Sequence, residues 1–132
     1  MEVILDTNFV ISCVREKLDF VNLSEELFDE NMQFFLPEEV LKEIEKLSKR
    51  KGEKSTDKNA AKTAMAILNS LEKKGEIHKI ALENEDVDSG LVNYVKMNPE
   101  EKFVLATLDR ELKKKAGCRI LTIRGKKMLE LV

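Results

Sequence analysis

Apolar and polar positions along the chain alternate in a pattern that switches repeatedly between short strands and amphipathic helices. Short apolar runs predict five strands, at 3–5, 33–36, 77–82, 103–106 and 119–123. Apolar residues at helical spacing predict helices over 8–15, 19–30, 86–97, 109–115 and 125–131, with others beginning at 37 and spanning 60–71. Polar residues 48–55 predict a loop between two of these helices.

Strands separated by helices favour a parallel sheet with helices on both faces. At 132 residues, the chain is long enough for one domain with a sizeable core. The sequence therefore predicts an α/β fold, a single-domain three-layer α/β/α arrangement with a five-stranded parallel sheet over residues 1–132.

The composition narrows the class of protein only slightly. The net charge of −2 comes from 23 basic and 25 acidic residues, and this balance excludes no class of partner. No apolar stretch approaches the roughly 20 residues that a membrane span needs, and Glu2 and Asp6 interrupt any secretion signal. We therefore expect a soluble, cytoplasmic protein. Cys13, Cys118 and the single histidine, His78, form no cluster, which predicts reduced core cysteines and no zinc site.

Two aspartates stand where predicted strands end. Asp6 follows the apolar run 3–5, and Asp109 follows the run 103–108, although aspartate occurs only seven times against 18 glutamates. In parallel sheets ligands bind at the carboxyl ends of the strands, so both carboxylates are expected at the binding edge. An aspartate in such a position can also be a helix N-cap, and this structural alternative stays open for Asp109.

Two more acids can join this edge. Glu43 lies beside the apolar stripe of the helix that follows the second strand, whereas Glu38 and Glu45 are predicted to face solvent. After the third strand, Asp86 is predicted as a helix N-cap, which places Asp88 in the first helical turn. Each signal alone is also typical of a solvated helix face or a cap.

The joint placement of these acids predicts a hard-cation site. Carboxylates crowded at one edge repel one another, and Mg²⁺ or Mn²⁺ would relieve that repulsion. Such ions activate a water and stabilise charge on a phosphate, so the pattern favours phosphate chemistry that needs no side-chain nucleophile.

Four segments of the chain resemble the acidic segments of PIN-domain nucleases, a family that includes VapC-like and ribosomal-RNA-processing members. They are 6–9, 37–44, 87–92 and 106–112, and their order and spacing cover essentially the whole chain. The resemblance implies a metal-dependent endoribonuclease, a hydrolase of phosphodiester bonds that cleaves single-stranded RNA with a metal-activated water. It also implies that the catalytic metal ligands are Asp6, Glu43, Asp88 and Asp109, and that the cofactor is Mg²⁺ or Mn²⁺.

The resemblance assigns supporting roles as well. Thr107 is expected to make a hydroxyl hydrogen bond near Asp109. Many relatives carry a second acid directly after the position of Asp88, whereas Ser89 stands there in this chain. Asp86 is therefore kept as an alternate ligand.

Basic residues flank the acidic edge in three groups and predict contacts with backbone phosphates. A solvated lysine-rich surface is the structural alternative. The groups are Lys46, Lys49, Arg50, Lys51 and Lys54; Arg110, Lys113, Lys114 and Lys115; and Arg124, Lys126 and Lys127. With six Phe, one Tyr and no Trp, the sequence favours tracking of the RNA backbone over base stacking.

Several functions compete at this level. As a nuclease, the chain is either the toxin of a toxin–antitoxin pair or a ribosomal-RNA-processing enzyme. The expected partner is therefore an antitoxin or a ribosome-assembly protein. The family resemblance also implies a homodimer. The alternative is a catalytically inactive PIN-like RNA-binding or scaffolding module. A receiver domain is disfavoured because Asp6 alone follows the first strand, and a DxD phosphatase because Asn8 stands where its second Asp should be.

Overall fold

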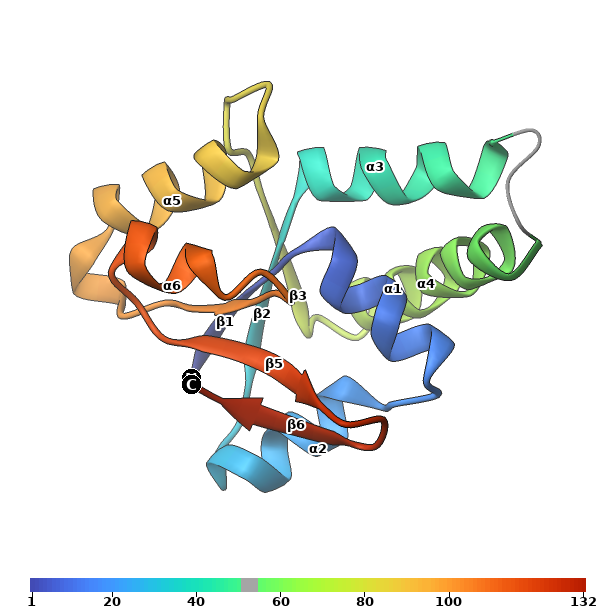
Figure 1. Ribbon diagram of the computed structural model, residues 1–132, viewed down its shortest axis with the longest axis horizontal. Helices are drawn as coiled ribbons and strands as arrows, with labels where there is room; N and C mark the ends of the chain where they lie inside the picture. The colour runs from blue at the N-terminus through green and yellow to red at the C-terminus, as the bar shows by residue number, and fades with distance from the viewer. Residues whose placement is uncertain (51–54) are drawn as a thin grey trace.

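Figure 1 shows the computed structural model of the chain, which describes residues 1–50 and 55–132. Its elements are β1 (Glu2–Leu5), α1 (Thr7–Arg15), α2 (Phe20–Phe28), β2 (Gln33–Pro37), α3 (Glu38–Lys49), α4 (Ser55–Lys73), β3 (Ile77–Ile80), α5 (Val87–Met97), a 3₁₀ turn (Pro99–Glu101), β4 (Val104–Ala106), α6 (Glu111–Ala116), β5 (Ile120–Arg124) and β6 (Met128–Leu131). Of the predicted loop 48–55, positions 51–54 lie outside the described residues. The loop prediction is wrong for Ser48 and Lys49, which belong to α3, and for Ser55, which begins α4, whereas Arg50 is the C-cap of α3.

In the described residues the sheet has six strands in the order β3-β2-β1-β4-β5-β6. The strands β1 to β5 run parallel, and β6 is antiparallel to β5. Ile4 of the central β1 pairs with Phe35 on one side and Leu105 on the other. The predicted α/β class is confirmed. Because β1 and β4 are neighbours, the residues that follow them emerge side by side at the carboxyl edge of the sheet.

The helix predicted over 125–131 is wrong, because this segment forms the sixth strand. Gly125 has φ +60°, a conformation that glycine adopts easily, and the chain reverses there so that Arg124 pairs with Met128. Leu129 is buried between an exposed Met128 and a half-buried Glu130, which is the two-residue period of a strand. Pairing with β5 satisfies backbone groups that an isolated short helix would leave to water.

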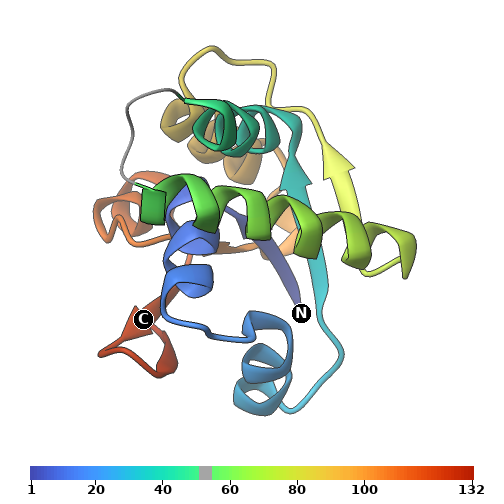
Figure 2. The same ribbon diagram turned by 90° about the vertical axis from the view of Figure 1, so that its right-hand side faces the viewer.

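The helices cover both faces of the sheet. On one face Leu5 packs in a core cluster with Phe9 of α1 and with buried residues of α2, α3 and α4. On the other face Ile4 packs with Leu91 of α5 and Leu112 of α6. Figure 1 shows α1 and α4 on one side of the strands and α5 and α6 on the other, and Figure 2 shows α4 crossing in front of the sheet below α3. Within the described residues, none of these helices combines the length and apolar character needed to cross a bilayer.

Candidate active site

Asp6 lies between the end of the central strand β1 and the start of α1. It is 5% exposed and serves as the N-cap of α1, where its Oδ1 accepts a hydrogen bond from the Thr7 backbone N–H at 2.8 Å. The Asp6 backbone N–H donates to the Ala106 carbonyl at 2.9 Å, so the residue is fastened to the end of β4. The carboxylate is therefore held rigidly at the carboxyl edge of the sheet.

Thr107 links the two acids that follow adjacent strands. Its buried hydroxyl donates to Asp6 Oδ2 at 2.7 Å and accepts from the Asp109 backbone N–H at 3.1 Å. The hydroxyl hydrogen bond expected of Thr107 is thus present. Asp109 Oδ1 in turn accepts from the Glu111 N–H at 3.0 Å, so this carboxylate also supports the start of α6. One threonine thereby fixes the spacing between two segments that are about a hundred residues apart.

Asn8 strengthens the same junction from α1. Its side-chain Oδ1 accepts from the Leu108 backbone N–H at 3.1 Å. This bond ties the first turn of α1 to the loop between β4 and α6. The segment 6–8 and the segment 107–109 therefore behave as one hydrogen-bonded unit.

Glu43 and Asp88 approach the edge from helices. The buried Val40 and Ile44 seat α3 on the sheet, and the exposed Glu43 lies between them in sequence. Asp88 is exposed in the first turn of α5, which Asp86 caps by accepting from the Ser89 N–H at 3.2 Å and the Ser89 hydroxyl at 2.6 Å. The cap predicted at Asp86 is confirmed.

Gly90 explains how close α5 comes to the strand edge. A Cβ at this position would meet the Leu82 Cβ at 2.9 Å and the Asn84 Cβ at 3.2 Å. Only a residue without a side chain fits there unless the neighbouring segment shifts. This close approach sets the depth of the first turn of α5, and therefore of Asp88, relative to the sheet.

A cavity of about 320 Å³ brings three of the four predicted acids together. We call it the acid cavity, and Asp6, Thr7, Glu43 and Asp88 line it together with Asn8 and residues of α1, α3 and α5. Asp109 is absent from this lining and adjoins it through Thr107. The Thr7 hydroxyl is buried and, among the described residues, has no hydrogen-bond partner. A polar group left unsatisfied in this way is costly unless something binds it.

The pKa values show that these acids sense one another. Burial raises the pKa of Asp6 to about 6, against the hydrogen bonds from Thr107 and Thr7, and the charges of Asp88 and Glu43 raise it further. Burial also raises the pKa of Asp88, and the charge of Asp109 adds to the effect. Asp6 is therefore repelled by Glu43 and Asp88, and Asp88 is also repelled by Asp109.

The four carboxylates are near one another without forming a closed ligand set. Within residues 1–50 and 55–132, no three Asp, Glu, His or Cys side chains are arranged to hold a metal ion as they stand. Like charges keep apart when nothing lies between them, and Glu43 and Asp88 are exposed and free to choose other rotamers. The structure therefore joins the predicted acids in one neighbourhood but leaves the predicted metal coordination as a prediction.

Comparison with known proteins adds the family. Residues 3–126 match the sequence profile of a family described as PIN like domain. This chain belongs to the PIN-like domain family. The resemblance to PIN-domain nucleases drawn from the four acidic segments is confirmed.

Individual relatives of this PIN-like domain span its whole length. It is 26% identical over 133 residues to Ribonuclease VapC4 of Methanocaldococcus jannaschii, a match that covers 98% of this chain and 95% of VapC4. The structure of the PIN domain endonuclease Utp24 matches with a TM-score of 0.74 at 21% identity, over 98% of this chain and 90% of that one. The VapBC2 complex of Rickettsia felis, bound to a fragment of promoter DNA, contains a chain that matches with a TM-score of 0.54 at 16% identity, over 92% and 98%. The two solved structures support the fold.

Two contacts around the candidate site of the PIN-like domain were not predicted from its sequence. Glu39, on the first turn of α3, accepts from the backbone N–H groups of Leu82 and Glu83, both at 3.0 Å, and so anchors the segment that leads into α5. Arg15, at the end of α1, lines the acid cavity. Neither carries a local signal, because Glu39 resembles any acid in a first helical turn and Arg15 resembles any cation in a last one.

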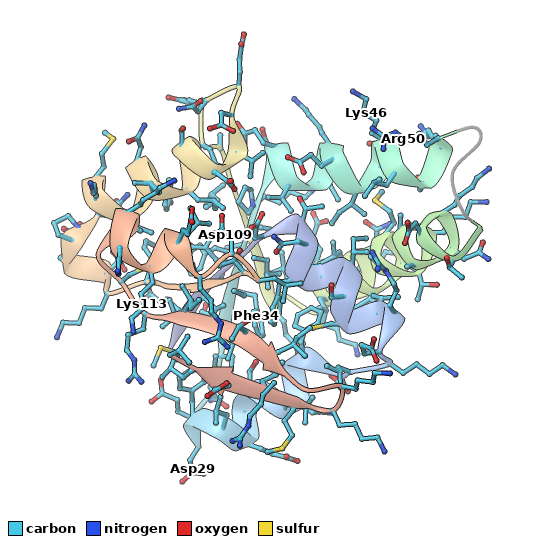
Figure 3. All side chains as sticks on the ribbon, in the orientation of Figure 1. Asp29, Phe34, Lys46, Arg50, Asp109 and Lys113 are labelled. Atoms are coloured by element: carbon cyan, nitrogen blue, oxygen red, sulfur yellow. The ribbon has the colours of Figure 1, made fainter. Side chains whose placement is uncertain are left out.

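The predicted basic groups of the PIN-like domain separate in space. Figure 3 shows Asp109 beside the start of α6, whereas Lys46 and Arg50 lie at the far end of α3. Lys51 and Lys54 lie outside the described residues. Lys115 is the member of these groups that lines a cavity next to Asp88.

Proposed function

We propose that this PIN-like domain is a metal-dependent endoribonuclease that cleaves single-stranded RNA at the acid cavity. The observation that carries the proposal is the convergence of Asp6, Glu43 and Asp88 on one cavity, with Asp109 hydrogen-bonded beside it through Thr107. Membership of the PIN-like family and the similarity to a protein named as a ribonuclease support it further.

The donor set at this edge fits a hard divalent cation. Its side chains offer carboxylate oxygens, which Mg²⁺ and Mn²⁺ prefer, and no thiol or imidazole lines the cavity. The buried Thr7 hydroxyl has no partner among the described residues, as expected of a group that faces a bound water or phosphate. Asp6, Glu43, Asp88 and Asp109 would hold the cation. When bound, such an ion lowers the pKa of a water and balances charge on a scissile phosphate.

The chain's own groups have distinct tasks in this scheme. Asp6 and Asp109 provide fixed oxygens, because hydrogen bonds from Thr7, Thr107 and Glu111 hold their carboxylates in place. Glu43 and Asp88 provide oxygens that can turn inward once their repulsion is neutralised. The Thr7 hydroxyl can donate to a phosphate oxygen or to the attacking water. No side-chain nucleophile is required.

Two cellular roles are compatible with such a ribonuclease. The name of VapC4 favours a toxin that pairs with an antitoxin, as does the VapBC2 assembly. The basic residues after Asp109, and the likeness of segment 106–112 to processing-type relatives, favour ribosomal-RNA processing. A small antitoxin gene adjacent to the gene for this chain would decide for the toxin. Its absence, together with association of the protein with ribosome precursors, would decide for processing.

The direct test is cleavage of a labelled single-stranded RNA with Mg²⁺, Mn²⁺ or EDTA, using the wild type beside Asp109→Asn. A matched control is Asp29→Asn, because Asp29 lies at the bottom edge of the molecule in Figure 3, away from Asp109, and asparagine tolerates its φ of 52°. We expect metal-dependent cleavage by the wild type and by Asp29→Asn, and none by Asp109→Asn. Cleavage that survives EDTA or Asp109→Asn would refute the proposed site. Metal binding without cleavage of any RNA would favour the inactive binding module.

A further inference from the structure

A second cavity borders the acid cavity at Asp88. This second space, of about 420 Å³, lies between α5 and α6, and it shares Asp88 with the first. Val92 and Leu112 give it an apolar floor, and Lys96 and Lys115 line it. We call it the α5–α6 cavity. The two cavities meet at Asp88, and together we call them the depression at the carboxyl edge of the sheet.

Arg15 stands at the α1 end of this depression. Asn8, Ser12 and Arg15 follow the spacing i, i+4 and i+7, so one face of α1 presents all three to the acid cavity. The Arg15 Cα lies about two helical turns beyond that of Asn8, or about 10 Å along the axis. Its Nη2 pairs with Asp57 Oδ1 of α4 at 3.2 Å, and the side chain is half exposed. A guanidinium has five N–H donors, so the pair with Asp57 leaves others for a second oxyanion.

Lys115 stands at the other end. Lys115 lines the α5–α6 cavity together with Asp86 and Asp88, which places its side chain near the two carboxylates. Among the described residues, no ion pair within 4.0 Å engages it. Lys96 lines the same cavity. The cation is therefore close to the acids, yet it remains available to an anion that enters the cavity.

Each cation has a purely structural explanation. Arg15 could serve only to brace α4 through Asp57, and Lys115 could serve only to offset the charges of Asp86 and Asp88. Neither explanation accounts for the common position of the two cations, at opposite ends of one depression with carboxylates between them. A polyanion meets repulsion at the acids, and cations on both sides of them would help to hold it there.

We propose that Arg15 and Lys115 hold backbone phosphates of a single RNA strand on opposite sides of the acid cavity. The strand then crosses the carboxyl edge of the sheet from α1 to the α5–α6 cavity, and its register over the acids is set by these two contacts. Phosphate contacts carry no base information, so this arrangement fixes the position of the strand and leaves sequence preference to other contacts. The inference rests on the proposed function.

The test is the salt dependence of RNA binding. A labelled single-stranded RNA is titrated at fixed Mg²⁺ and varied KCl in an Asp109→Asn background, where the RNA should stay intact. Arg15→Ala and Lys115→Ala are each expected to weaken binding and to reduce the slope of log K against log salt by about 0.7, the value of one phosphate contact on a single strand. Arg119→Ala and Lys102→Ala remove matched cations at the amino edge of the sheet and should leave the slope unchanged.

Three further variants separate phosphate binding from structural roles. Arg15→Lys and Lys115→Arg keep the charge and should restore the slope. Asp57→Asn breaks the brace to α4 but keeps Arg15, and it should leave binding as tight as before. If Asp57→Asn reproduces the loss caused by Arg15→Ala, or if Arg15→Ala and Lys115→Ala behave like the amino-edge controls while RNA still binds, the inference is overturned and the nuclease proposal stands. If the wild type neither binds nor cleaves RNA, both fail.

Discussion

The two halves of the acidic site are built differently. Asp6 and Asp109, which we call the sheet pair, follow adjacent parallel strands and are joined through the buried hydroxyl of Thr107. Glu43 and Asp88, the helix pair, are exposed, Glu43 in the second turn of α3 and Asp88 in the first turn of α5. The sheet pair is therefore fixed before any ligand arrives, whereas the helix pair can move. The difference suggests that the sheet pair defines where a cation binds and the helix pair closes around it.

The largest effect is expected at the buried member of the sheet pair. Asp6→Asn should lower cleavage by about 100-fold or more, because a fixed charge at the reacting centre is lost. The fold should survive, since asparagine can still accept the hydrogen bond from the Thr7 N–H. Cleavage assays beside circular dichroism check both expectations. Wild-type cleavage by this variant would show that the sheet pair does not define the site.

The same variant has a consequence for stability that depends on pH. The pKa of Asp6 is raised from 3.8 to about 6 in the folded chain, so the folded state binds the proton more tightly than the unfolded state. In EDTA the free energy of unfolding of the wild type should therefore fall as pH rises from about 4 to 6, by at most about 3 kcal/mol. Asp6→Asn should lack this fall. Parallel pH profiles of the two proteins would contradict the assigned burial.

The helix pair should affect activity without affecting stability. Glu43→Gln and Asp88→Asn are each expected to lower cleavage by about 10- to 100-fold, as loss of a supporting ligand does, while the free energy of unfolding changes by less than about 0.5 kcal/mol. Glu45→Gln, two positions after Glu43 and paired with Lys49, is the control and should cleave normally. Loss of stability in the Glu43 or Asp88 variant would place that acid in the fixed half instead.

Thr107→Val tests how the sheet pair is held. Valine keeps the shape but removes the donor to Asp6 and the acceptor for the Asp109 N–H, so stability should fall by about 1–3 kcal/mol. Cleavage should fall by about 10-fold as the carboxylate loses its orientation. Thr107→Ser keeps the hydroxyl and should recover most of both. If the valine variant cleaves as well as the serine variant, the hydroxyl bridge does not position the site.

The smallest effect on cleavage is expected from substitutions of Asp86, which the sequence analysis kept as an alternate metal ligand. Asp86→Ala removes the N-cap of α5 and should lower the melting temperature by a few degrees, while cleavage stays near the wild-type rate. Asp86→Asn keeps a capping oxygen and should restore the melting temperature. Reduced cleavage in both variants would instead make Asp86 a ligand and revise the membership of the helix pair.

The sequence predicts the sheet pair well because a strand exit is a local signal. An apolar run that ends in aspartate places that aspartate at the carboxyl edge whenever the strands are parallel. The helix pair is harder to predict from the sequence. Glu43 and Glu39 are both acids on α3, and which segments their side chains contact depends on how α3 packs on the sheet. Contacts such as those of Glu39 with Leu82 and of Arg15 with Asp57 join distant segments and leave no local pattern.

The hairpin of β5 and β6 is a second feature that the sequence did not predict. Segment 125–131 is too short to distinguish a helical period from a strand period, so its identity depends on the free edge of β5. The parallel strands β1 and β4 were predictable because they are buried apolar runs, whereas an antiparallel edge strand of four residues was not.

The most direct test of the account is paramagnetic broadening of backbone amide signals by substoichiometric Mn²⁺. We expect selective broadening around positions 6, 43, 88 and 109 in the wild type, and its loss in Asp6→Asn. Broadening near 6 and 109 alone would remove the helix pair from the site. Broadening spread evenly over acidic surface residues such as Asp29, and unchanged by Asp6→Asn, would contradict the metal site itself.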